Sequence, residues 1–237
     1  MTADPKTTAQ GNSRQGYDLR ELMTPGHEAC PGCGAAMALR LALKALGPDC
    51  ALVVPRSCVA SSLGPFPFSA VRLPLLHVPA GTAAASASGL RAALDLSGRE
   101  AVKVVAWGDR DDAFGPGLAH LMTAAGRNER IIYVCCDTKR PGEGNARPPV
   151  DAISALRGGA IPYFATTTPA LPLDLDSKFK TAASADGFCF LHLLAACPPE
   201  WGIDPSGSVR AMREAALSGR FPLSEAPGTT SPHDGGR

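Results

Sequence analysis

The chain has 237 residues, of which 45% are hydrophobic and 19% charged, and a formal net charge of +1 at pH 7. This length and composition allow a large core, most simply in one domain, while the near-neutral charge gives no indication of binding to nucleic acid or to an anionic membrane surface. No run approaches the roughly 18 apolar residues of a membrane span, and the first residues lack the apolar stretch of a signal peptide, so we expect a cytoplasmic protein.

Both ends of the chain are predicted to be loose around one body. Residues 1–24 are polar and aperiodic, and residues 225–237 are rich in Pro, Gly, Ser and Thr, a composition typical of segments that do not pack. We therefore expect a flexible segment over 1–24, a single α/β domain over 25–224 and a disordered tail over 225–237.

Short apolar runs alternate with helical patterns through this body. We predict helices at residues 35–46, 81–96, 115–126 and 208–219, and strands at residues 51–54, 101–107, 130–136 and 187–194. The strands are continuously apolar, which is typical of strands buried on both faces. Their alternation with helices predicts an α/β fold: a doubly wound, mostly parallel sheet with helices on both faces and ligands beyond the carboxyl ends of its strands.

A pair of cysteines, Cys30 and Cys33, stands directly before the first helix. The chain has eight cysteines, and in a reducing compartment metal binding or redox chemistry explains such a number better than a disulfide framework. The two thiolates of a CxxC motif can serve a disulfide, a protein partner, a zinc ion or an iron–sulfur cluster, depending on which other ligands reach them.

Polar residues follow two of the predicted strands. Gly108 and Asp109 come after strand 101–107, and Asp137 and Thr138 come after strand 130–136. A carboxylate and a hydroxyl on neighbouring strand ends suit a hard cation such as Mg²⁺ and a diphosphate. The alternative is a plain solvated loop, because acidic residues at strand ends are common.

In this order, the segments of the body resemble the β subunit of the 2-oxoacid:ferredoxin oxidoreductases, the pyruvate:ferredoxin oxidoreductase family. The matching segments are GHEACPGCGAAMALRLALKALG, SCVASS, HVPAGTAAASASGLRAAL, GRNERIIYVCCDT, CPPEWGID and SGRFPLSEA. Their shared order is far more specific than any one of them.

The resemblance implies a [4Fe–4S] cluster held by four cysteines, Cys30, Cys33, Cys58 and Cys197. Four thiolates are what such a cluster requires. A structural zinc site with the same ligands is an alternative, and a thioredoxin-like dithiol is a weaker one because no strand precedes the CxxC motif. Cys135, Cys136 and Cys189 are predicted to be buried core thiols, and Cys50 has no assigned role.

The resemblance also implies Mg²⁺ and thiamine diphosphate at the strand ends. The Mg²⁺ ligands would be Asp109, Thr138 and the carbonyl of Arg140, with Gly108, Arg110 and His77 near the cofactor. Two departures from the family pattern follow.

Gly108-Asp109-Arg110 replaces the family's Gly-Asp-Gly, and its Asn-Thr-Gly is not recognisable after the second strand. One hypothesis is that Arg110 binds the diphosphate, with help from Lys139 or Arg147. The other is that its charge replaces the metal, or that an ion pair with a nearby acid, Asp111, Asp112 or Glu143, fills the pocket.

The function implied by the resemblance is thiamine-dependent oxidative decarboxylation of a pyruvate-type 2-oxoacid. Coenzyme A would take the acyl group, and the cluster would pass electrons to ferredoxin or a ferredoxin-like subunit. The α subunit and other subunits would complete the catalytic site, so this chain alone is expected to be inactive. The alternative is a degenerate relative without thiamine, acting as an iron–sulfur electron relay or scaffold.

Overall fold

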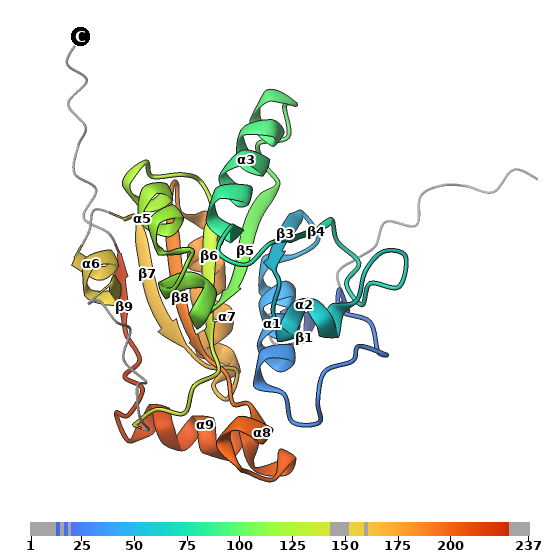
Figure 1. Cartoon of the computed structure of the whole chain (residues 1–237), viewed down its shortest axis with the longest axis vertical. Coiled ribbons are helices and arrows are strands. Elements are labelled where there is room, and N and C mark those ends of the chain that lie inside the picture. Colours follow the sequence, from blue (N-terminus) through green and yellow to red (C-terminus); the bar gives the residue numbers. More distant parts are fainter. Residues whose placement is uncertain (1–12, 15–16, 19, 143–151, 159–160, 228–237) are drawn as a thin grey trace, which may run out of the picture.

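A computed structural model of the chain describes residues 13–14, 17–18, 20–142, 152–158 and 161–227 (Figure 1). Its main sheet has seven strands in the order β4-β3-β5-β6-β8-β7-β9. The strands are β3 (Cys50–Pro55), β4 (Leu75–Val78), β5 (Lys103–Asp109), β6 (Ile132–Asp137), β7 (Tyr163–Thr167), β8 (Cys189–Leu194) and β9 (Glu225–Pro227). All neighbouring pairs are parallel except β7 and β9. A separate pair of two-residue strands is β1 (Ser13–Arg14) and β2 (Tyr17–Asp18).

Helices cover both faces of this sheet, which confirms the predicted doubly wound α/β class. The helices are α1 (Gly34–Leu46), α2 (Cys58–Leu63), α3 (Ala83–Leu96), α4 (Arg110–Phe114), α5 (Leu118–Gly126), α6 (Ala152–Gly158), α7 (Pro172–Ser184), α8 (Pro198–Trp201) and α9 (Ser208–Leu217). None of the described helices combines the length and the apolar character that crossing a membrane requires.

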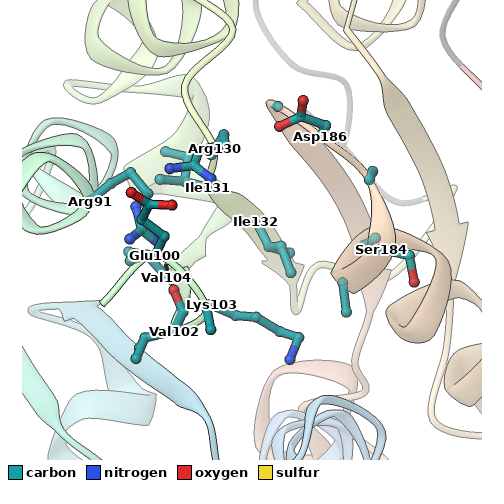
Figure 2. Close-up of a pocket in the computed structure, with 15 residues that line it drawn as sticks. Arg91, Glu100, Val102, Lys103, Val104, Arg130, Ile131, Ile132, Ser184 and Asp186 are labelled. Carbon is teal, nitrogen blue, oxygen red and sulfur yellow. Dashed lines mark hydrogen bonds between the residues drawn. The ribbon is translucent and has the colours of Figure 1, made fainter. Parts of the chain in front are cut away.

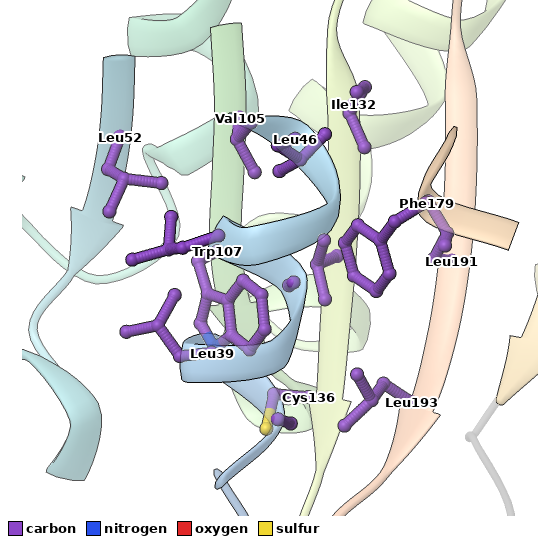
Figure 3. Close-up of a cluster of buried hydrophobic side chains, with 14 of the residues drawn as sticks. Leu39, Leu46, Leu52, Val105, Trp107, Ile132, Cys136, Phe179, Leu191 and Leu193 are labelled. Atoms are coloured by element: carbon purple, nitrogen blue, oxygen red, sulfur yellow. The ribbon is translucent and has the colours of Figure 1, made fainter. Parts of the chain in front are cut away.

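Alternate side chains of each central strand enter different cores. On β5, Val105 and Trp107 join the core under α1 and α7, whereas Val104 and Ala106 join the core under α3 and α5. Figure 3 shows the first core, where the ring of Trp107 stacks on Phe179 of α7 with 6.3 Å between ring centroids. Burial on both faces explains why the strand sequences are continuously apolar.

A third cluster of buried side chains lies at the carboxyl ends of the strands. Leu194 at the end of β8 packs there with Trp201 of α8, Met212 of α9 and Phe221. In Figure 1, α8 and α9 lie together across this end of the sheet. The cluster fixes the segment that contains Cys197.

The predicted elements are confirmed with shifts of a few residues; helix 115–126 is α5, which begins at Leu118 after Gly115-Pro116-Gly117. Sequence patterns missed the short strands β1, β2, β4, β7 and β9 and the helices α2, α4, α6, α7 and α8. The α7 sequence begins with Pro172 and contains two aspartates, which obscures its apolar stripe. The strand β7 is short, and its sequence YFATT ends in three small or polar residues.

Residues beside both predicted boundaries make contacts with the body. Near residue 24, Met23 forms an antiparallel bridge with Val71, and the Thr24 N–H donates to the Ala70 carbonyl at 2.6 Å. At the other end, β9 pairs with β7, and the Tyr163 hydroxyl donates to Glu225 Oε1 at 2.7 Å. Residues 1–12 and 228–237 of the predicted loose ends lie outside the described residues.

Candidate functional site

The sequence-predicted site residues lie mainly on segments that leave the carboxyl edge of the sheet. Cys58 follows β3, Asp109 ends β5, Thr138 follows β6 and Cys197 follows β8. Parallel strands place all these ends at one edge, where ligands of α/β proteins bind.

Cys30, Cys33, Cys58 and Cys197, called here the cysteine site, come from three loops that contact one another. The Cys33 N–H donates to the Cys30 carbonyl at 3.1 Å, which closes the CxxC turn. The next residue, Gly34, donates its N–H to the Ala196 carbonyl at 2.9 Å, immediately before Cys197. A Cβ on Gly34 would lie 2.5 Å from the Ala196 nitrogen, so only glycine allows this approach.

Gly32 packs closely against the backbone of the segment that follows α8. Its φ is +70°, and a Cβ there would lie 2.7 Å from Cα of Pro205. The left-handed backbone and the close approach both require glycine. The CxxC turn is therefore held between the loops on either side of α8.

The Cys58 thiol interacts electrostatically with the other three cysteines. Burial raises the pKa of the Cys58 thiol, and Cys33, Cys30, Cys197 and then Asp109 raise it further. Asp109 therefore interacts electrostatically with the cysteine site. Asp109, Arg110, Thr138 and Arg140 are called here the strand-end group.

Within the described ranges, no three Cys, His, Asp or Glu side chains are gathered as closely as a single metal ion requires. The described cysteines are all free thiols, with Cys30 and Cys58 exposed and Cys33 and Cys197 half-buried. Four free thiols on converging loops are a donor set whose chemistry fits an iron–sulfur cluster.

The other four cysteines are buried in the sheet. Burial raises the pKa of Cys50 to about 11 and that of Cys189 to about 12. The pKa values of Cys135 and Cys136 are also raised, first by burial. Their positions agree with the predicted core thiols, and Cys50, whose Sγ lies 3.3 Å from the Gly47 carbonyl, joins them.

A cavity of about 410 Å³ lies beside the CxxC turn. Its lining includes Cys30 and Cys33, the side chains of Met37 and Leu41 on α1, and His27. The cysteine site therefore borders an open, largely apolar hollow on one side.

Asp109 starts α4 at the end of β5. Its Oδ1 accepts the Asp112 N–H at 2.7 Å, the usual contact of an N-cap residue. Burial raises the pKa of the Asp109 carboxyl; the N–H of Asp112 opposes this, and the charges of Asp112 and Asp111 add to it. A cation at this place would restore the ionised form.

Arg110 is buried next to Asp109. Its Nη1 lies 4.0 Å from Asp137 Oδ2 at the end of β6, and Asp137 Oδ2 lies 3.0 Å from His192 Nε2 on β8. All three side chains are buried. The acids predicted to pair with Arg110 were Asp111, Asp112 and Glu143; Asp137 and its contact His192 come instead from the neighbouring strands β6 and β8.

Asp112 ties α4 to the loop before α3. Its Oδ1 accepts the Gly81 N–H, and its Oδ2 accepts the Tyr133 hydroxyl at 2.8 Å. A Cβ on Gly108 would lie 2.5 Å from the Tyr133 oxygen. Gly108 is thus required by packing in this chain, whether or not a ligand approaches it.

The segment after β6 is fastened to α8. The indole N–H of Trp201 donates to the Thr138 carbonyl at 2.7 Å, and Arg140 Nη1 donates to the Trp201 carbonyl at 3.3 Å. Lys139 pairs with Glu200 at 2.6 Å, which commits it to α8. Since α8 begins beside Cys197, these contacts connect the two halves of the site.

His77 lies on the outer strand β4, which β3 separates from β5, and its Nε2 is 3.3 Å from the Gly64 carbonyl. Glu143, Arg147 and the place of the family's Asn-Thr-Gly lie outside the described residues.

A second cavity, of about 360 Å³, lies at the amino ends of the strands β5, β6 and β8 (Figure 2). Its charged lining includes Arg91 and Arg130, which both pair with Asp95, at 2.8 and 2.6 Å. These arginines are committed to structural ion pairs at the amino ends of the strands, so this cavity is not the candidate site.

The chain is similar in sequence to named subunits of two oxidoreductases. It is 33% identical over 230 residues to the pyruvate synthase subunit PorB of Methanothermobacter thermautotrophicus, with 86% of this chain and 80% of that protein covered. It is 31% identical over 240 residues to the ketoisovalerate oxidoreductase subunit VorB of Pyrococcus furiosus, with 87% and 76% covered.

The fold is also found in a solved structure, that of the 2-oxoglutarate:ferredoxin oxidoreductase from Magnetococcus marinus. The TM-score is 0.64 at 21% identity, over 91% of this chain and 88% of that chain. No protein-family model matches the chain. The identity to PorB and VorB confirms the resemblance inferred from the motifs: the chain belongs to the family of the β subunits of the 2-oxoacid:ferredoxin oxidoreductases.

Proposed function

We propose that this chain is the cluster-binding and thiamine diphosphate-binding β subunit of a pyruvate-type 2-oxoacid:ferredoxin oxidoreductase. The observation that carries the proposal is the convergence of the cysteine site with the strand-end group at the carboxyl edge of one sheet. The hydrogen bond from Gly34 to Ala196 and the influence of Asp109 on Cys58 support that convergence.

The cysteine site would hold a [4Fe–4S] cluster. Cys30 and Cys33 supply adjacent ligands on one turn, and Cys58 and Cys197 close the cage from the ends of β3 and β8. Soft thiolates are the ligands such clusters select. Cys33 and Cys197 are half-buried, whereas Cys30 and Cys58 are exposed.

The strand-end group would hold Mg²⁺ and the diphosphate of thiamine diphosphate. Asp109, the Thr138 hydroxyl and the Arg140 carbonyl are the oxygen donors that suit Mg²⁺. Arg110 would add a buried positive charge for the diphosphate, and the pair of Asp137 and His192 would orient its guanidinium. We also keep His77 on β4 as a proposed cofactor contact; its Nε2 lies 3.3 Å from the Gly64 carbonyl.

When bound, these groups supply an electron sink for decarboxylation, in the case of thiamine diphosphate, and one-electron transfer, in the case of the cluster. The chain's own residues bind and orient: Asp109 and Arg110 fix the diphosphate, and the contacts of Trp201 with Thr138 and Arg140 hold this group near Cys197. We propose that an α subunit completes the substrate pocket, that coenzyme A accepts the acyl group and that ferredoxin or a ferredoxin-like subunit accepts electrons.

The free state of the described cysteines suits a reducing compartment, so we place the complex in the cytoplasm. We also keep the predicted single domain over 25–224 as part of the proposal, since the three cores lie on one continuous sheet.

The second candidate is an iron–sulfur relay or scaffold subunit without thiamine. Arg110 favours it, because a buried guanidinium beside Asp137 can occupy the place of the metal. Both candidates predict iron and partner subunits, and they differ in the cofactor.

One experiment separates these candidates: purify the assembled complex and measure iron, acid-labile sulfide, zinc and acid-extracted thiamine diphosphate. The proposal expects about four iron and four sulfide per β chain, together with thiamine diphosphate. Zinc without iron or sulfide would rule out the cluster, and a fully iron-loaded complex without thiamine diphosphate would establish the relay.

A further inference from the structure

The loop from Gly64 to Ala70, called here the aromatic loop, holds two phenylalanine rings in solvent. Phe66 is 93% exposed and Phe68 is 85% exposed. Each ring forgoes the stabilisation that burial of a phenylalanine provides. Large exposed apolar groups that stand together mark interaction sites more often than single ones do.

The exposure is not the result of a loosely attached loop. The Phe68 N–H donates to the Pro65 carbonyl at 2.8 Å, and the Ala70 N–H donates to the Leu63 carbonyl at 2.7 Å. Ala70 in turn accepts the Thr24 N–H and is buried. The rings therefore project from a fixed base, an arrangement that lowers the entropy cost of binding.

The aromatic loop lies next to an open strand edge. Among the described strands, β4 pairs only with β3, so its other edge has no strand partner there. Leu76 on β4 is 44% exposed, and His77 on the same strand contacts Gly64 at the base of the loop. Figure 1 shows the loop projecting beside β4, away from β8 and β7.

The edge strand β4 is four residues long, lies between Pro74 and Pro79, and carries no permanently charged side chain of its own. Natural edge strands are blunted by charged residues or proline, as β9 is at the other edge with Glu225 and Pro227. The sequence of β4, LLHV, has neither a proline nor a permanently charged residue. The combination of an open edge and exposed rings favours a protein partner over plain solvent.

The charges around the aromatic loop and β4 indicate which kind of protein can bind there. Residues 54–78 contain Arg56 and Arg72, both exposed, and no aspartate or glutamate. A symmetric contact between two copies would place the same arginines opposite each other, and like charges across an interface are costly. A different chain with acidic groups around an apolar socket meets no such cost.

We propose that the aromatic loop and the edge of β4 form the docking face for another subunit of the same oxidoreductase, with Phe66 and Phe68 inserted in an apolar socket rimmed by acidic side chains. The inference rests on the proposed function only for the existence of that complex. Beyond the proposed function, it specifies where on this chain the partner binds. The loop begins only six residues after Cys58, so the partner would lie beside the cysteine site.

The test compares the complex formed by the full chain with that of the double variant Phe66→Ser/Phe68→Ser, each co-expressed with the other subunits. Aromatic anchors at interface centres dominate binding energy, so we expect association at least about tenfold weaker, measured by light scattering and by titration of the purified subunits. The matched control is Leu96→Ser/Leu173→Ser, which removes two side chains that are 91% and 70% exposed on α3 and α7. We expect that control to assemble as the unaltered chain does.

A variant in which two arginines are replaced by glutamates provides a second test of the docking face. Arg56→Glu/Arg72→Glu should weaken assembly more at low salt than at high salt, because the acidic rim would then repel it. Unfolding curves of every variant should match that of the unaltered chain, since the substituted side chains are exposed. Normal assembly of the phenylalanine double variant would overturn the inference, as would a loss confined to self-association of this chain.

Cofactor analysis of the same samples separates this inference from the proposed function. A complex that depends on Phe66 and Phe68 but contains neither iron nor thiamine diphosphate would sustain the docking face and contradict the proposed function. A complex that contains iron and thiamine diphosphate and assembles normally without both phenylalanines would support the proposed function and contradict the docking face.

Discussion

Arg110 and Asp137 face each other across the carboxyl ends of two neighbouring strands, with 4.0 Å between Nη1 of the arginine and Oδ2 of the aspartate. Arg110 opens α4 directly after β5, and Asp137 is the last residue of β6. Both are buried, and His192 contacts the same carboxylate oxygen. The family's glycine is thus replaced by a residue whose charge is held inside the candidate thiamine site.

Replacing Arg110 by glycine restores the family motif and tests the role of that charge. If the guanidinium binds the diphosphate, Arg110→Gly should weaken thiamine diphosphate binding about tenfold to a hundredfold, the value of a charge-assisted hydrogen bond. The measurement is calorimetric titration of the apo complex. Arg110→Ala should give a similar loss without the added backbone freedom of glycine.

Arg127→Gly is the matched control, because Arg127 is an exposed arginine paired with Glu129 at 2.9 Å at the end of α5. It should leave binding unchanged. Tighter binding by the Arg110→Gly chain would mean that the arginine blocks the pocket, which contradicts the role proposed for it.

Removing the Asp137 carboxylate should destabilise the fold. Asp137→Ala leaves Arg110 and His192 buried without the carboxylate that both contact and also removes the acceptor of the Lys139 N–H. Loss of one member of a buried ion pair costs about 3 kcal/mol, measurable as a lower free energy of unfolding in urea. Asp111→Ala, at an exposed position on α4, should cost well under 1 kcal/mol. Equal effects of the two substitutions would show that the buried pair contributes nothing to stability.

The cluster ligands can be tested without any assay of activity. Cys58→Ser and Cys197→Ser should each lower the iron and acid-labile sulfide content of the purified complex by at least about half, because a hydroxyl is a poor ligand for iron. Cys50→Ala is the control, since this buried thiol lies at the start of β3 away from the cysteine site. Full iron content in Cys58→Ser would remove Cys58 from the ligand set.

The fold was largely predictable because its central strands are buried on both faces. Continuous apolar runs identified β3, β5, β6 and β8, which are four of the seven strands of the sheet. The outer strands β4 and β9 have exposed or polar residues and no such signal. Their recognition depends on pairing with a neighbour, which a local pattern does not contain.

Motif order predicts residues of the candidate site but not the contacts between them. Asp109, Thr138 and the four cysteines were predicted from motifs, whereas the partners of Arg110 come from strands far apart in sequence. His192 was missed because it lies inside an apolar run, although its register places it opposite Cys135, two residues before Asp137. Trp201, which fastens Thr138 and Arg140 to α8, carries no signal that sequence alone provides.

The pH dependence of stability should contain a contribution from Glu21, which anchors the segment before the CxxC turn to α1. Its carboxylate accepts hydrogen bonds from Arg40 at 2.9 and 2.7 Å and pairs with Lys44. The hydrogen bond from Arg40 is the main cause that lowers the pKa of Glu21 from 4.5 to about 2. The folded state therefore binds the proton more weakly than the unfolded chain does, and Glu21 stabilises the fold above pH 4.5 and loses that effect as the pH falls toward 2.

The side chain of Glu21 is 38% exposed, so solvent and salt reduce the effect to about 0.5 kcal/mol. We expect Glu21→Gln to lower the melting temperature slightly at neutral pH, and the difference from the unaltered chain to shrink as the pH falls from 4.5 toward 2. Glu214→Gln is the control, because Glu214 lies 3.8 Å from Arg210 on an exposed face of α9; its effect on the melting temperature at neutral pH should be smaller than that of Glu21→Gln. A difference for Glu21→Gln that stayed constant from neutral pH to pH 2 would mean that the ion pair with Arg40 does not lower the pKa of Glu21 in solution.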